Sequence, residues 1–89
     1  MVIGGSHAAR AAKLSRQERA VLAGLAAGRS TEQIATVMFV SPHTVRTHVK
    51  NGMRKLAAHT RAHAVAIAIG EGAIERPQTE PLGEPEVAA

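Results

Sequence analysis

The stretch SPHTVRTHVKNGMRKL, residues 41–56, constrains the fold more than any other part of this chain. Serine followed by proline is typical of a helix start, because the hydroxyl caps the first turn and proline is tolerated there. On a helical wheel the apolar and basic residues separate onto opposite sides. One side holds Val45, Val49, Gly52 and Leu56, and the other holds His43, Arg46, Thr47, Lys50 and Arg54. Such a helix can dock on a small core and present cations to a ligand, although a merely solvated amphipathic helix has the same pattern.

Charge is unevenly distributed along the chain. Residues 1–70 hold ten Lys or Arg against two Glu, a net charge of +8, while residues 71–89 hold one Arg against five Glu. A basic domain of this size indicates a polyanionic partner, most simply nucleic acid. Phe39 is the only aromatic residue, which argues against binders that stack single-stranded bases on aromatic platforms.

Composition also excludes several classes of protein. The 89 residues make one small domain at most. The absence of Cys removes disulfides and thiolate metal sites and fits a cytoplasmic location, and no apolar run is long enough to span a membrane. Without Asp or Cys there is no Ser-His-Asp set and no cysteine nucleophile, so we expect no enzyme and no cofactor. His59 and His63 are spaced for a shared metal but lack a third ligand nearby, so no metal site is predicted.

Capping signals divide the chain into four helices. Two capping boxes, Ser15 to Glu18 and Ser30 to Gln33, precede apolar residues at helical spacing, and Thr60 can cap a final helix. We therefore predict helices at about 16–27, 31–38, 42–57 and 61–72 in a domain of residues 14–75. A flexible basic arm, 1–13, and a disordered acidic, proline-rich tail, 76–89, flank this domain. The short connection before Ser41 makes the second and third helices a helix-turn-helix.

The fourth helix is apolar on more than one side. Ala64, Val65 and Ala68 form one apolar side, while the isoleucines lie elsewhere on the wheel. This is more apolar surface than a three-helix core covers, and a second copy of the chain is the natural partner. The predicted dimer interface consists of Ile67, Ile69 and Ile74.

With the helices placed, the sequence resembles the LuxR-type, or GerE-like, DNA-binding domain. The resemblance rests on LSRQERAVLAGLAAGRSTEQIA, VSPHTVRTHVKNGMRKL and TRAHAV, which together span about residues 14–69. It implies an all-α, four-helix domain whose third helix enters the DNA major groove and whose fourth helix pairs in a dimer. Ala57 departs from the family pattern, which has a glycine after the third helix, and Gly52 replaces a large aliphatic residue.

The resemblance assigns roles to individual positions. Arg46, Thr47 and Lys50 match the groove-facing positions, in agreement with the helical wheel. Backbone or flanking contacts to DNA are expected from Thr31, His43, Thr44, Asn51 and Arg54. The threonines among these lie at helix starts, where the backbone N–H groups and the helix dipole favour anions.

The function expected from sequence is a sequence-specific regulator of transcription that binds double-stranded DNA as a homodimer in the cytoplasm, with no small-molecule ligand. One alternative is a protein-interaction regulator that pairs with a larger family member or with RNA polymerase. Another is an output domain cut from a two-component response regulator. The basic face of the third helix favours DNA binding, because a domain that only binds protein does not need Arg46, Lys50 and Arg54 on one side.

Overall fold

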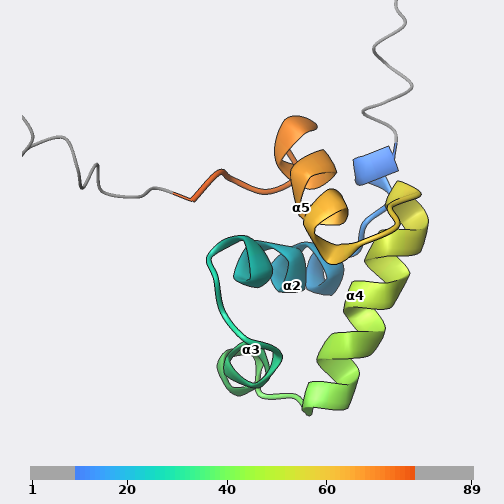
Figure 1. Cartoon of the computed structure of the whole chain (residues 1–89). Helices are drawn as coiled ribbons and strands as arrows, with labels where there is room; N and C mark the ends of the chain where they lie inside the picture. Colours follow the sequence, from blue (N-terminus) through green and yellow to red (C-terminus); the bar gives the residue numbers. More distant parts are fainter. Residues whose placement is uncertain (1–9, 78–89) are drawn as a thin grey trace, which may run out of the picture.

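The computed structural model describes residues 10–77, which fold into helices joined by short connections, with no β-strand among them. α2 spans Arg16–Ala26, α3 spans Thr31–Met38, α4 spans Pro42–Leu56 and α5 spans Arg61–Gly70 (Figure 1). A short helical turn at residues 10–12 precedes α2. The all-α fold expected from the sequence is confirmed. None of the helices in the described part of the chain is both long and apolar enough to cross a membrane.

A hydroxyl side chain caps the start of each of these helices. Ser15, Ser30, Ser41 and Thr60 each accept a hydrogen bond from the backbone N–H three residues further on, over 3.0 or 3.1 Å. In the first two cases Glu18 and Gln33 also accept the cap residue's own N–H, which completes the capping box. Because the first N–H groups of a helix have no partner inside it, these bonds fix where each helix begins.

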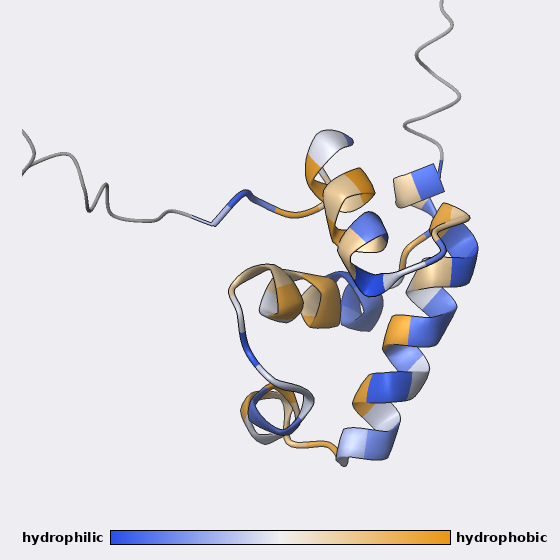
Figure 2. Ribbon diagram, viewed as in Figure 1, coloured by the Kyte–Doolittle hydropathy of each residue, from blue (hydrophilic) through white to orange (hydrophobic). Residues whose placement is uncertain are grey.

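The core lies where α4 crosses the other helices. α4 packs on α2, α3 and α5, and α2 also packs on α3 and α5. Figure 2 shows the apolar segments of α4 facing α2 and its hydrophilic segments facing outward. Fully buried side chains from both helices meet at the centre of this core: Val21, Leu22, Val45 and Leu56.

Left-handed residues end both helices of the helix-turn-helix. Phe39 closes α3 with φ of 60° and Ala57 closes α4 with φ of 56°. An L-residue with a Cβ pays roughly 1–2 kcal/mol in this conformation, which is why glycine is the usual choice. Ala57 therefore ends α4 one residue earlier than expected, at Leu56, and with some strain.

The N-terminal boundary differs from the expected one. Residues 10–12 are helical rather than part of a flexible arm, and Ala11 is only 3% exposed. The Ala11 N–H donates to Oε1 of Glu71 over 3.0 Å, and the Arg10 guanidinium donates to the Leu56 carbonyl over 3.4 Å. Partners 46 and 60 residues away hold this turn in place, so local sequence gave no sign of it. Residues 1–9 of the expected arm, and residues 78–89 of the expected tail, lie outside the described residues.

The C-terminal helix also ends earlier than expected. α5 stops at Gly70, and Gly72 adopts φ of 79°, which turns the chain back over the end of the helix. The Ala73 N–H then bonds to the Ala68 carbonyl over 2.8 Å. This reversal packs Ile74 into the core, where it is 8% exposed. Ile74 was expected in a dimer interface because the helical wheel was extended past Gly70, where the helix has already ended; in the structure its side chain packs into the core of its own chain.

Two buried glycines differ in how closely their neighbours approach. A Cβ at Gly52 of α4 would lie 3.5 Å from Cδ1 of Leu22 and 3.7 Å from Cδ2 of Leu14, which is ordinary van der Waals contact. A Cβ at Gly24 of α2 would lie 2.7 Å from Cγ1 of Ile34, well inside contact distance. Close helix packing therefore requires glycine at position 24 but not at position 52.

We predict that Gly52→Ala raises the free energy of unfolding by about 0.5–1 kcal/mol, because alanine is the better helix former and its methyl group fits. Gly24→Ala gains the same helix propensity but forces Ile34 to move, and overpacking typically costs about 1–3 kcal/mol. Urea unfolding followed by circular dichroism should give Gly52→Ala a higher free energy of unfolding than the parent chain, and Gly24→Ala a lower one than Gly52→Ala. The reverse order would contradict the packing described for α2, α3 and α4.

Candidate nucleic-acid interface

The outward face of α4 is basic and open to solvent. His43, Arg46, Thr47, Lys50 and Arg54 are all exposed. On the opposite face Val45, Val49, Gly52 and Leu56 are buried, so the two sides found on the helical wheel correspond to burial and exposure. α4 contains no Asp or Glu, and its exposed cations are therefore not neutralised by carboxylates of their own helix.

Polar groups on this face also bind one another. The Thr47 hydroxyl donates to the His43 carbonyl over 3.1 Å, which directs its methyl group and remaining lone pairs away from the backbone. The Arg54 guanidinium donates to Oδ1 of Asn51 over 3.0 Å. Because this bond uses the acceptor of the Asn51 amide, the amide N–H₂ donors stay available, and Arg54 is held beside them. A pair of this kind offers several donors to one anionic group.

The starts of α3 and α4 add further donors. Thr31 and Thr44 are half-buried in the first turns of these helices. The Thr44 N–H is already bonded to the Ser41 hydroxyl, and the two hydroxyl oxygens are 3.0 Å apart. The partial positive charge and the unpaired N–H groups at a helix start favour an anion at the start of α3 and at the start of α4.

An ion pair fixes the far end of α4. Nζ of Lys55 lies 2.7 Å from Oε1 of Glu18 at the start of α2, with 32% of the lysine side chain and 6% of the glutamate side chain exposed. Burial raises the pKa of Glu18, but hydrogen bonds from Lys55 and from the Ser15 N–H, together with the charge of Lys55, outweigh burial and hold the pKa below its ordinary value of 4.5. The same carboxylate oxygen thus caps α2 and holds α4 against it.

The exposed part of α5 is smaller than the sequence indicated. Ala64 and Ala68 are buried against the core, while Ile67 and Ile69 are half-buried. With Ile74 in the core, these two isoleucines remain as the partly exposed members of the expected interface.

Near the start of α5 the two histidines considered as metal ligands stack with ring centroids 6.3 Å apart. The His59 N–H donates weakly to Nδ1 of His63 over 3.5 Å. This leaves Nε2 as the free nitrogen of the His63 ring.

Comparison with known families now identifies the domain. The family described as "Bacterial regulatory proteins, luxR family" matches residues 12–68, which is most of the described part of the chain. The chain belongs to the LuxR family of bacterial regulatory proteins. α3 and α4 are accordingly the helix-turn-helix of a domain from a family of DNA-binding transcriptional regulators.

Individual relatives show how much of a LuxR-family protein the chain represents. The spore germination protein GerE of Bacillus subtilis is 37% identical over 62 residues, which cover 70% of this chain and 84% of GerE. The probable transcriptional regulatory protein NarL of Mycobacterium tuberculosis is 46% identical over 56 residues, covering 63% of this chain and 26% of NarL. The transcriptional regulatory protein YhcZ of Bacillus subtilis is 40% identical over 57 residues, covering 64% of this chain and 27% of YhcZ. The chain thus spans about a quarter of the length of YhcZ and NarL and most of GerE.

Sequence reasoning missed the role of Lys55. Glu18 was interpreted as part of a capping box, and no partner was assigned to Lys55. A signal was nevertheless present, because Glu18 lies three and four residues before Val21 and Leu22, on the face of α2 that turns inward. A carboxylate on a buried face needs a cation nearby, and the last turn of α4 supplies it.

We predict that Glu18→Gln lowers the free energy of unfolding by about 1–2 kcal/mol at pH 7, because glutamine keeps the capping box but loses the charged bond to Lys55. Since the folded-state pKa of Glu18 is depressed, its stabilising effect is complete above its ordinary value of 4.5 and is lost as the pH falls through the folded-state value.

The difference between Glu18→Gln and the parent chain should therefore shrink between pH 5 and pH 3 in urea titrations. Glu75→Gln, at an exposed position, is the matched control and should change little at any of these pH values. A Glu18→Gln deficit that stays constant down to pH 3 would show that charge is not the cause.

Proposed function

We propose that this chain binds double-stranded DNA sequence-specifically and regulates transcription, with α4 in the major groove and Arg46, Thr47 and Lys50 against the base edges. The observation that carries the proposal is the exposed basic face of α4, which lies opposite a face buried in the core. Arginine and lysine pair with guanine edges, and the threonine methyl group can contact the methyl group of thymine.

Phosphate contacts come from the residues around these three. Arg54 and Asn51 form a hydrogen-bonded pair on the same helix and together supply donors to one phosphate. His43 and Thr44 lie in the first turn of α4 and Thr31 begins α3, so that phosphates of the groove walls meet helix starts. Such contacts fix the position of α4 without reading sequence.

The proposed active form is a dimer formed through α5, bound to a two-fold-related site. Ala64 and Ala68 are buried in the core, while Ile67 and Ile69 on the same helix remain half-exposed, and α5 is largely apolar in Figure 2. Pairing two copies of α5 removes these isoleucines from water, and a symmetric dimer presents two copies of α4 to two half-sites.

Base reading is tested by selecting from a pool of random duplexes and sequencing the bound fraction. We expect enrichment of an inverted repeat, and its loss in the Arg46→Ala, Lys50→Ala double variant. On the selected duplex each single substitution should cost about 1–3 kcal/mol and relax discrimination at one base pair. Lys13→Ala, which removes an exposed lysine outside α4, is the control and should leave the selected motif unchanged.

Salt dependence separates base reading from charge attraction. Removing a side chain that touches only phosphate weakens binding to all duplexes alike. It also lowers the slope of log affinity against log salt concentration by about one. The proposal of sequence-specific binding fails if no motif is enriched and if Arg46→Ala and Lys50→Ala change only the salt dependence of binding, equally for all duplexes. The expected partner is then a protein, such as a larger family member or RNA polymerase.

The dimer is tested by Ile67→Glu, which places a charge on the proposed interface. We expect sedimentation equilibrium to show a monomer and the affinity for an inverted repeat to fall, while circular dichroism shows an intact helical domain. Val37→Glu makes the same kind of change at an exposed aliphatic residue of α3 and should leave the oligomeric state unchanged. A parent chain that sediments as a monomer, or an Ile67→Glu variant that sediments as a dimer, would rule out the α5 interface.

A further inference from the structure

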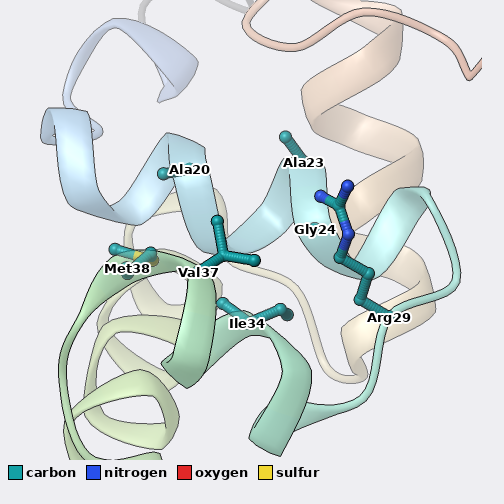
Figure 3. A pocket seen from close by; sticks show the side chains of 7 residues that line it. All are labelled: Ala20, Ala23, Gly24, Arg29, Ile34, Val37 and Met38. Carbon is teal, nitrogen blue, oxygen red and sulfur yellow. The ribbon is translucent and has the colours of Figure 1, made fainter.

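A groove with an apolar lining runs between α2 and α3, on residues that the DNA-binding proposal does not use. It encloses a cavity of about 290 Å³ (Figure 3). Ala20 and Ala23 of α2 line one side, and Val37 and Met38 of α3 line the other. The alanines are too small to fill the space between the helices. Val37 is 59% exposed on the groove wall, which leaves apolar surface in contact with water.

One end of the groove carries a positive charge. Arg29, in the connection between α2 and α3, is exposed, and Figure 3 shows its side chain rising alongside Ala23 and Gly24. Within residues 10–77 no carboxylate forms an ion pair with Arg29. A ligand that fits this groove therefore has an aliphatic side chain next to a carboxylate, in an extended segment narrow enough to lie between two helices.

The chain's own C-terminal segment has this chemistry. Residues 78–89, QTEPLGEPEVAA, contain three Glu and no Lys or Arg, and Leu82 stands between Glu80 and Glu84. Prolines at 81 and 85 favour an extended backbone. We propose that the groove between α2 and α3 binds residues 78–89 of the same chain, with Leu82 in the apolar part and a neighbouring glutamate paired with Arg29.

The segment is long enough to reach the groove. Twelve extended residues span at most about 40 Å, whereas α2, with its eleven residues, is only about 16 Å long. In Figure 1 residues 74–77 leave α5 on the side of the view where α2 ends and the connection to α3 begins. The described part of the chain thus ends on the same side of the view as the connection between α2 and α3, which carries Arg29.

Tethering decides between this segment and a free partner. One aliphatic side chain and one exposed ion pair correspond at best to roughly millimolar affinity. A short tether also supplies an effective concentration in the millimolar range, so a groove of this affinity is occupied for up to about half of the time. A separate protein at micromolar concentration would leave it mostly empty.

The groove is also a better match than the basic face of α4. That face attracts acidic residues, but its exposed side chains are polar or charged and offer no apolar site for Leu82. Docking between α2 and α3 satisfies both the charge and the apolar side chain, and it leaves α4 free to bind DNA.

The chain has no cysteine, so Ala88→Cys creates a unique site for a nitroxide spin label. In the ¹⁵N-labelled chain of 89 residues the label should broaden the amide signals of Ala23, Arg29 and Val37 and leave those of Arg46 and Lys50 sharp. Arg29→Gln should reduce the broadening roughly two- to five-fold, because it removes the ion pair. Arg54→Gln, which removes an equivalent charge from α4, is the matched control and should not reduce it.

Substitutions of Val37 provide a second test that does not endanger the fold, because this side chain is already largely exposed. Val37→Glu should repel the acidic segment and abolish the broadening, whereas Val37→Lys should retain it. Broadening centred on α4, or no broadening anywhere, would overturn the proposal. So would broadening of an unlabelled ¹⁵N chain mixed with spin-labelled ¹⁴N chain, since docking would then occur between molecules.

Discussion

The structure depends on the burial of one face of α4. Val45, Val49 and Leu56 are among the most completely buried residues of the described chain, and they meet Val21 and Leu22 of α2. Because these side chains fix the rotation of α4 about its own axis, they also fix which residues point outward. The salt bridge between Lys55 and Glu18 adds a constraint at the last turn, where a rotation or shift of the helix would separate the two charges. The basic face of α4 is thus positioned by the buried residues on the opposite side of the helix and by the pairing of Lys55 with Glu18.

This arrangement explains how so small a domain holds α4 in one orientation. Four hydroxyl caps fix the helix starts, and the alanines of α5 allow it to pack closely on the core. The side chains that could contact DNA are carried on a helix, not on a loop, and therefore have defined positions before binding.

Most of the fold was predictable because its signals are local. The capping boxes pair a serine with a Glu or Gln three residues later, and Ser41 is followed directly by a proline. The apolar stripe of residues 42–56 likewise repeats every three or four residues. Each of these signals depends only on neighbours within one or two helical turns. The same locality made the faces of α4 predictable. The predictions failed where distant partners decide the structure. Ala11 is held by Glu71 across 60 residues, and Ile74 enters the core only because Gly72 reverses the chain. The pairing of Glu18 with Lys55, across 37 residues, was likewise invisible to a search for helix caps.

The central claim is that the exposed face of α4 is where this chain meets DNA, and it is tested most directly by titrating the ¹⁵N-labelled protein with a short duplex and mapping the amide shifts. Even a duplex of arbitrary sequence suffices, because phosphate contacts precede base reading. We predict that the largest shifts fall on residues 43–54 and at the start of α3, with little change in the middle of α2. Shifts concentrated on α2 or α5, with α4 unaffected, would contradict the claim.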